Sequence, residues 1–226
     1  MYYTDIKEAI FLNRPNRFIA NIQLDGRTEI CHVKNTGRCK ELLLPGAKIY
    51  VQQAANPNRK TKYSLISVYK GDQLVNIDSQ APNKVFAEWL AKGGLGEELT
   101  QIKAEYNFLD SRLDFYAETP KAKILIETKG VTLEEDGVAL FPDAPTERGV
   151  KHLETLINSL SLGYRAYAVF VIQMKGVSLF SPNGKTHPAF AHTLKTAQEK
   201  GVNILALDCQ VTKNSITIHQ PIPTII

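Results

Sequence analysis

Apolar and polar residues alternate over short runs in the first third of the chain, which is typical of β-strands that bury one face. Strands are predicted over residues 17–24, 28–33, 48–52, 63–69 and 73–78. Asp25-Gly26 is a strong hairpin turn between the first two strands. A short helical piece is predicted over 40–44, ending at Pro45. About five short strands with one helical interruption are typical of a small β-barrel of the OB type.

After residue 80 the apolar positions follow helical spacing in three segments, separated by more continuous apolar runs. Helices are predicted from Asn83 to Gly93, from Thr146 to Gly163 and from Pro188 to Glu199. Strands are predicted near 102–108, 111–118, 123–130, 166–173, 202–207 and 215–219. Asn83 and Thr146 are expected as N-caps, and Pro188 as the first residue of its helix. The predicted fold class is α+β, with an OB-like barrel over residues 1–80 and an α/β domain, a mixed sheet flanked by helices, over residues 81–226.

The composition is that of a soluble globular protein. The chain has 226 residues, of which 43% are hydrophobic and 22% charged, so it is long enough to bury a sizeable core. No apolar stretch reaches the length of a transmembrane helix, and the N-terminus has no signal-peptide core. Cys31, Cys39 and Cys209 are odd in number and fit no zinc pattern. We therefore expect free thiols, a cytoplasmic location and no membrane partner.

Positive charge is concentrated in the first third of the chain. Residues 1–82 carry twelve Lys and Arg against seven Asp and Glu, whereas the remainder carries fifteen against sixteen. Two interpretations stay open, a surface that contacts a polyanion and an ordinary solvated surface. For the first, the candidate nucleic-acid-binding residues are Arg14, Arg17, Lys34, Arg38, Lys40, Arg59, Lys60 and Lys62. OB barrels bind nucleic acid strands through such basic loops beside exposed aromatic rings.

Two neighbouring predicted strands carry candidate catalytic groups. Asp114 lies on the strand 111–118, and Glu127 and Lys129 lie on the strand 123–130. Glu127 and Lys129 are two residues apart, so they share one face of their strand. If the strands pair as a hairpin, two carboxylates and an ammonium come together, as Mg²⁺-assisted cleavage of a phosphodiester requires. The alternative is a solvent-facing hairpin with ordinary charges. The flanking apolar residues favour a buried set that is paired or metal-bound.

Seven motifs are spread over nearly the whole chain. They are Arg14-Pro-Asn-Arg-Phe, Asn35-Thr-Gly-Arg, Leu43-Leu-Pro-Gly-Ala, Arg112-Leu-Asp-Phe, Ile126-Glu-Thr-Lys-Gly-Val-Thr-Leu, Phe141-Pro-Asp-Ala-Pro-Thr-Glu-Arg-Gly and Lys151-His-Leu. On these motifs the chain resembles the sugar fermentation stimulation protein A (SfsA) family. The resemblance implies an N-terminal OB-like domain, a C-terminal PD-(D/E)xK nuclease-like domain, and DNA binding without strong sequence preference. The family name comes from an effect on sugar-utilisation genes, which implies a regulatory role.

Carried over residue by residue, the nuclease motif implies Asp114 and Glu127 as metal ligands and Lys129 as the motif lysine. The backbone carbonyl of Thr128 is a further candidate ligand. Many members of the nuclease superfamily add an acidic residue from the first helix, for which Glu88 is the candidate here. The alternative for Glu88 is an ion pair with the lysine four residues before it.

Arg148 and His152 are four residues apart and share one face of the second predicted helix. Arg148 is expected to clamp a phosphate, and His152 to position a water or the phosphate. The alternative is a charged stripe that faces solvent. Both residues lie in the motifs on which the chain resembles the SfsA family, and this favours the role in phosphate binding. Asp143 is expected to reach the metal or, with a slight preference, to cap the helix. Gln173 either lines the site or satisfies backbone groups.

The leading hypothesis is a cytoplasmic DNA-binding protein in which Asp114 and Glu127 hold Mg²⁺ or Mn²⁺ and Lys129 assists phosphodiester hydrolysis. The second is a non-catalytic DNA-binding regulator of sugar-utilisation genes on the same scaffold. The third is a hydrolase of oligonucleotides or nucleotides. The expected partner is DNA bound with little sequence preference, and a homo-oligomer is compatible with the sequence.

Overall fold

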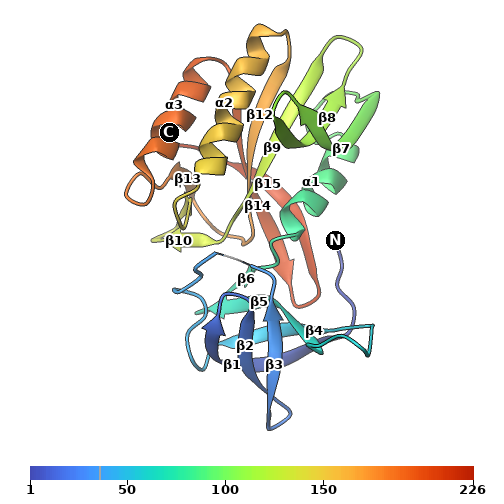
Figure 1. The fold of residues 1–226 in the computed structure, drawn as a ribbon, viewed down its shortest axis with the longest axis vertical. Helices are drawn as coiled ribbons and strands as arrows, with labels where there is room; N and C mark the ends of the chain where they lie inside the picture. The colour runs from blue at the N-terminus through green and yellow to red at the C-terminus, as the bar shows by residue number, and fades with distance from the viewer. Residues whose placement is uncertain (36) are drawn as a thin grey trace.

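A closed β-barrel forms the first part of the chain and lies below a larger domain of sheet and helices in Figure 1. The computed structural model describes residues 1–35 and 37–226. The strands of the first part are β1 (Ile6–Asn16), β2 (Ile19–Leu24), β3 (Arg27–Val33), β4 (Lys48–Gln53), β5 (Tyr63–Lys70) and β6 (Gln73–Asn76). Their order is β3-β2-β1-β4-β5-β6, and the parallel pairing of β3 with β5 closes five of them into the predicted barrel.

The alternation along β2 and β3 decides which side chains fill the barrel. Ala20, Ile22 and Cys31 are fully buried, because alternate positions of a strand face the same side of the sheet. Between the two strands, Asp25 and Gly26 adopt positive φ values of 50° and 75°. This is the geometry of a tight Asp-Gly hairpin turn, as the sequence predicts.

Two sequence predictions for the barrel are wrong. The prediction omits β1, because Glu8 and Arg14 interrupt its apolar alternation. The segment 40–44 is a series of turns and not a helix. In it, Leu42 is buried against the barrel core. An apolar run of this length does not distinguish a short helix from a turn that covers a core.

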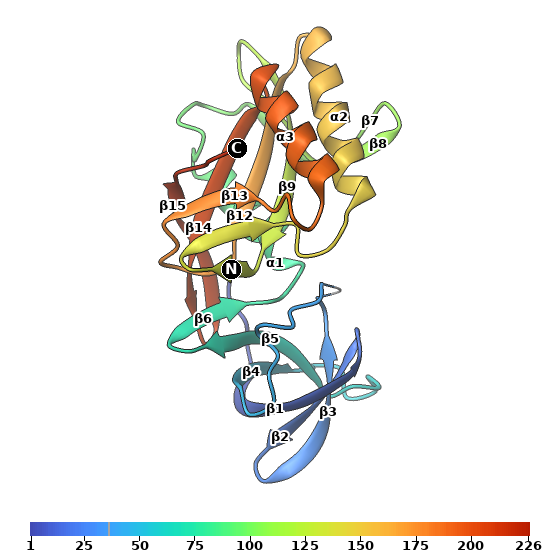
Figure 2. The ribbon, with the colours of Figure 1, turned by 90° about the vertical axis from the view of Figure 1, so that its left-hand side faces the viewer.

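A six-stranded mixed sheet forms the centre of the second domain, in the order β15-β14-β12-β9-β8-β7. Its elements are α1 (Ala81–Ala91), β7 (Gln101–Phe108), β8 (Ser111–Glu118), β9 (Lys123–Val131), α2 (Glu147–Ser161), β12 (Arg165–Ile172), α3 (Pro188–Glu199), β14 (Asn203–Thr212) and β15 (Ser215–Ile222). The strands β9, β12 and β14 are parallel, and antiparallel hairpins flank them. Figure 2 shows α2 and α3 side by side over one face of this sheet.

Helices on both faces give the sheet two apolar cores. On one side, Phe86 of α1 packs with Phe115 and other residues of the same cluster. On the other side, Leu156 of α2 and Phe190 of α3 pack in the cluster that contains Phe170. Because β12 and the first half of β9 are covered on both faces, residues 166–172 and 124–126 are continuously apolar and lack alternation.

The sequence predictions omit a small second sheet. It consists of β10 (Leu133–Glu135), β11 (Val138–Phe141) and β13 (Leu179–Pro182), in the order β10-β11-β13. Strands of three and four residues are too short to establish a period of two. The small sheet lies beside the large sheet, at its end towards the barrel (Figure 1), and Glu134 of β10 accepts a hydrogen bond from Lys70 of the barrel, so it contributes to the junction of the two domains.

The three helices predicted after residue 80 are confirmed apart from one N-cap. The hydroxyl of Thr146 accepts a hydrogen bond of 3.1 Å from a first-turn amide, and Pro188 begins α3. The helix α1 begins at Ala81, so Asn83 lies in its first turn and is not the N-cap. The side chain of Asn83 is bonded to Asp114 instead. None of the described helices is long and apolar enough to cross a membrane.

Candidate functional site

Two carboxylates lie where the ladder between β8 and β9 ends. The antiparallel pairing stops at Phe115 and Ile126, and Asp114 and Glu127 lie just beyond this last pair. The amide of Thr128 donates to Asp114 Oδ2 at 2.8 Å. The predicted hairpin is confirmed, and it carries both carboxylates to the same end of two neighbouring strands.

Glu127 is buried, with 3% of its surface exposed. Its Oε1 accepts hydrogen bonds from Lys129 Nζ and from His152 Nδ1. Its Oε2 is buried and has no hydrogen-bond partner among the described residues. Burial by itself raises the pKa of Glu127, but the hydrogen bond from His152 and the charge of Lys129 outweigh it and hold the pKa below its usual range. The side chain is therefore an ionised carboxylate with one oxygen left unbonded by protein groups.

The helix α2 brings His152 and Arg148 to Glu127. Arg148 Nε donates to His152 Nε2 at 3.3 Å. Because a guanidinium only donates, this ring nitrogen accepts, and the ring proton lies on Nδ1, facing Glu127. The spacing of four residues places both side chains on one helical face, as predicted. Arg148 is exposed, so the chain of contacts runs from solvent to the buried carboxylate.

Asp114 belongs to an adjoining cluster. Its Oδ1 accepts from Asn83 Nδ2 at 2.7 Å, and its Oδ2 accepts from the amide and the hydroxyl of Thr128, both at 2.8 Å. The Thr128 hydroxyl also lies 2.5 Å from Asn83 Oδ1. Successive residues of a strand point to opposite faces, so Glu127 is directed towards α2 and Thr128 towards α1. The two clusters therefore lie on either side of β9.

The possible metal donors of this site are oxygen atoms. They are the carboxylates of Asp114 and Glu127 and the backbone carbonyl of Thr128 between them. Such donors suit a hard divalent cation, whose other positions water or phosphate oxygens fill. In residues 1–35 and 37–226, no group of three or more His, Cys, Asp or Glu side chains is placed to hold a metal ion. A metal here would therefore have at most two such side chains as ligands among the described residues.

Family models of known proteins match both the barrel and the second domain of this chain. The family model "SfsA N-terminal OB domain" matches residues 12–77, and the model "Sugar fermentation stimulation protein RE domain" matches residues 80–215. The chain belongs to the sugar fermentation stimulation protein (SfsA) family. The predicted OB barrel and the predicted family are thus confirmed.

Two bacterial relatives match this chain over nearly its full length. Sugar fermentation stimulation protein homologs are 61% identical over 216 residues in Desulfitobacterium hafniense (strain DSM 10664 / DCB-2), covering 96% of this chain and 94% of the relative, and 56% identical over 226 residues in Clostridium beijerinckii, covering 100% of both. A solved structure described as Pyrococcus furiosus SfsA in complex with Ca²⁺ has a TM-score of 0.90 at 33% identity, covering 100% of this chain and 98% of that one.

Glu88 of this SfsA chain does not lie with the other candidate ligands. Its carboxylate accepts a hydrogen bond of 2.7 Å from the N-terminal ammonium of Met1, and 47% of its side chain is exposed. Glu88 therefore pairs with Met1 and not with Lys84, and among the described residues it does not join Asp114 and Glu127 in a group that could hold a metal ion. The orientation of α1 about its axis determines these contacts, because it directs Glu88 towards the N-terminus and Asn83 towards Asp114.

Asp143 and Gln173 connect the two domains. Asp143 Oδ2 accepts from the backbone amide of Arg38 at 2.9 Å, while Thr146 caps α2, so the capping role expected for Asp143 is wrong. Gln173 Nε2 donates to Asn76 Oδ1 at 2.9 Å. It also donates to the backbone carbonyl of Asp78 at 3.1 Å, so of its two open alternatives Gln173 takes the one that satisfies backbone groups.

The basic candidates of the barrel fall into separate groups. Arg14 donates from both terminal nitrogens to four backbone carbonyls, those of Arg17, Asn35, Gly37 and Arg38. Lys34 Nζ pairs with buried Asp78 at 2.9 Å. The structure thus gives Arg14 and Lys34 internal contacts in place of the expected free phosphate contacts.

Three other basic residues share one surface. Arg17, Arg38 and Lys40 are exposed and border a cavity of about 620 Å³ that also touches Ala144 of the second domain. Thr36 of the motif beside this cavity lies outside the described residues. The remaining candidates lie apart from it, in the loop between β4 and β5: Arg59, Lys60 and Lys62.

Sequence reasoning missed two polar side chains of the site. Asn83 was expected only as a cap, and Thr128 only through its carbonyl, yet both side chains bond to Asp114. The signal in the sequence is weak. Asn83 is a polar residue in the first turn of a helix whose other sheet-facing residues are apolar. Thr128 stands between the two charged residues of β9.

Proposed function

We propose that this protein binds DNA and hydrolyses phosphodiesters with a divalent metal ion, at a site of the PD-(D/E)xK nuclease kind. Glu127 carries the proposal. It is a buried, ionised carboxylate held by Lys129 and His152, and its Oε2 has no partner within the described part of the chain. An ionised oxygen in such surroundings costs free energy unless a cation meets it. Asp114 supplies a second carboxylate from the neighbouring strand.

The donor set fits Mg²⁺ or Mn²⁺. We assign Asp114, Glu127 and the carbonyl of Thr128 as protein donors, because hard cations prefer oxygen ligands and keep several waters. The P. furiosus relative is described in complex with Ca²⁺, which supports a divalent cation for this chain as well. When bound, such an ion neutralises phosphate charge and makes a bound water more acidic.

The neighbouring side chains have complementary roles in this proposal. Lys129 stabilises charge that develops on the phosphate or orients the attacking water. Arg148, exposed at the start of α2, binds two phosphate oxygens through its planar guanidinium. His152 is a positioning residue, because its Nδ1–H holds Oε1 of Glu127 and leaves Oε2 available.

Arg17, Arg38 and Lys40 hold the nucleic acid in this proposal. They border one cavity at the side of the barrel that faces the second domain. Contacts to phosphates position a strand without reading its sequence, so binding is expected to weaken steeply with salt and to show little sequence preference. The three cysteines are unpaired, which supports a reducing cytoplasm as the place of action.

Cleavage assays test the proposal. Single- and double-stranded DNA and RNA are incubated with Mg²⁺, Mn²⁺ or EDTA, using wild type, Asp114→Asn, Lys129→Ala and the control Lys151→Ala. We expect metal-dependent cleavage that falls at least about 100-fold in the first two variants and is unchanged in the control, whose lysine pairs with Asp110 at 2.9 Å. Cleavage that persists in EDTA, or in both site variants, contradicts the proposal.

One observation favours a second candidate function, a non-catalytic DNA-binding regulator. Both oxygens of Asp114 already accept hydrogen bonds from Asn83 and Thr128, as expected for a carboxylate that holds α1 against the sheet. In that case no substrate is cleaved, and salt-sensitive DNA binding is the same in wild type, Asp114→Asn and Lys129→Ala. The same assays, with DNA binding measured by fluorescence anisotropy, separate the two functions.

A further inference from the structure

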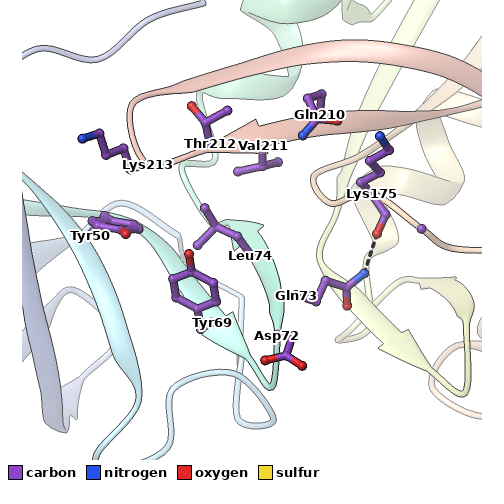
Figure 3. A pocket seen from close by; sticks show the side chains of 11 residues that line it. Tyr50, Tyr69, Asp72, Gln73, Leu74, Lys175, Gln210, Val211, Thr212 and Lys213 are labelled. Carbon is purple, nitrogen blue, oxygen red and sulfur yellow. Dashed lines mark hydrogen bonds between the residues drawn. The ribbon is translucent and has the colours of Figure 1, made fainter.

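A cavity of about 830 Å³ lies between the domains, away from the candidate site. The β5–β6 hairpin of the barrel forms its lower wall and the β14–β15 hairpin its upper wall (Figure 3). The strands β14 and β15 form the edge of the large sheet opposite to β7 and β8. Its described lining residues include none of the candidate catalytic groups. Its volume and its position at a domain junction are typical of small-molecule sites.

The barrel side of the cavity is aromatic. The ring centroids of Tyr50 and Tyr69 are 6.0 Å apart, and Lys48 Nζ lies 5.8 and 5.5 Å from them, so cation–π contacts hold the two rings together. Figure 3 shows the phenol oxygen of Tyr69 directed towards the β14–β15 hairpin. Leu74 and Val211 add apolar surface from the two walls. A flat, partly apolar group fits such a surface.

The rest of the cavity is polar and carries two lysines against one acidic side chain among the described lining residues. Lys175 and Lys213 are exposed, and no ion pair of either is found among the described residues. Gln73 Nε2 donates to the carbonyl of Lys175 at 2.7 Å (Figure 3), which ties the two domains together at this wall. Asp72 is the one acidic side chain among the described lining residues. The cavity therefore favours an anion.

We propose that this cavity binds a nucleoside phosphate, with its base against Tyr69 and Leu74 and its phosphates between Lys175 and Lys213. Aromatic side chains accept any base, because every base presents a flat face, and lysine ammonium groups pair with phosphate as point charges. The ligand is a free nucleotide or a nucleotide unit of a nucleic acid strand, since both share this chemistry. Bound here, it contacts both domains and couples their relative position to its own binding.

Isothermal titration calorimetry in EDTA tests the site without dependence on metal or cleavage. The full chain carrying Asp114→Asn is titrated with ATP, with inorganic triphosphate and with pentathymidylate. ATP or the oligonucleotide is expected to bind at least about tenfold more tightly than triphosphate, a difference of about 1.4 kcal/mol. The double variant Lys175→Ala/Lys213→Ala is expected to weaken this binding at least about tenfold. The control Lys195→Ala, an exposed lysine of α3, is expected to change nothing.

Tyr69→Leu separates the contribution of the ring from that of the charges. It is expected to lower the affinity for the preferred ligand to that for triphosphate and to leave triphosphate binding unchanged. Preference for ATP identifies a free nucleotide, and preference for pentathymidylate identifies a strand unit. Absence of binding by all three probes, or binding unaffected by the double lysine variant, overturns the proposal. Thermal unfolding of each variant verifies that it is folded, and neither result bears on whether Asp114 and Lys129 serve cleavage.

Discussion

The guanidinium of Arg14 lies among four backbone carbonyls, at distances from 2.6 to 3.0 Å. It joins the turn between β1 and β2 to the segment that follows β3, and so it holds Arg17 and Arg38 at the border of one cavity. A basic residue that the sequence predicts as a phosphate contact can thus act through the backbone that it organises.

Replacing Arg14 therefore affects stability first. Arg14→Ala is expected to lower the free energy of unfolding by about 2 kcal/mol, because hydrogen bonds from a charged donor are lost and their acceptors left unpaired. Urea denaturation followed by circular dichroism measures this. The matched control is Arg17→Ala, an exposed side chain, for which a change within about 0.5 kcal/mol is expected. Equal effects of the two substitutions would show that the carbonyl contacts of Arg14 contribute nothing.

At this scale the sequence predicts the candidate site only in part. Strand periodicity is enough to bring Glu127 and Lys129 to one face, and helical spacing is enough to bring Arg148 and His152 together. The bond between His152 and Glu127 joins two elements and depends on how α2 lies on the sheet. The same holds for Glu88 and Asn83, whose surroundings are set by the rotation of α1 and not by their neighbours in the chain.

The helix α2 illustrates how an element positions the site. Thr146 fixes its start, and the first two turns carry Arg148 and His152. Gly149 packs tightly here, because a Cβ added to it would lie 2.9 Å from Thr146 Cγ2 and 3.2 Å from Phe190. The start of α2 is thus fixed by a cap and by close packing together.

Removing the N-cap hydroxyl of Thr146 is expected to destabilise the first turn of α2. Thr146→Ala should lower the free energy of unfolding by about 1 kcal/mol, the usual effect of losing an N-cap oxygen. Thr146→Ser keeps the oxygen and is expected to retain most of the stability. Chemical denaturation of the three proteins under identical conditions measures the difference. If serine and alanine are equally destabilising, the hydroxyl bond to Gly149 is not what stabilises the helix start.

Elements with a strong periodic pattern or a continuous apolar run are predicted from sequence, and short or interrupted ones are not. The helices α2 and α3 and the strands β8, β9 and β12 follow from their apolar positions. The strand β1 contains charged residues, and β10, β11 and β13 have only three or four residues each. Their formation depends on partners distant in the chain, for example the parallel pairing of β11 with β13, which a local pattern does not contain.

Partly buried polar contacts join the barrel to the second domain across their junction. Lys70 of the barrel donates to Glu134 of the small sheet, at 2.6 Å to its carbonyl and 2.5 Å to its Oε2. Burial by itself raises the pKa of Glu134, but the bonds from Lys70 and from the amide of Gly137 outweigh it and hold the pKa below its usual range. Glu134 therefore favours the folded state when it is ionised.

This contact predicts a pH dependence of stability. Because the folded pKa of Glu134 is lowered, its contribution is complete above the unfolded value of about 4.3 and is lost as the pH falls through the folded pKa. Glu134→Gln is expected to cost about 1 kcal/mol at neutral pH and progressively less in acid. Urea titrations between neutral and acid pH measure this. The control Glu135→Gln, exposed on the same strand, is expected to parallel wild type, and a Glu134→Gln cost independent of pH would exclude the ion pair as its cause.

The first residues of the chain return to the second domain before the barrel begins. Tyr2 pairs with Ser215, and the amide of Tyr3 donates to the carbonyl of Asn214 at 2.8 Å. The barrel is thus fastened at two places, through residues 1–3 at the edge of the large sheet and through residues 77–80 ahead of α1. A body fastened at one point swivels in every direction, whereas one fastened at two turns only about the line that joins them. Together with the contacts that Arg38, Gln73 and Asn76 make across the junction, these two attachments oppose rotation of the barrel relative to the second domain.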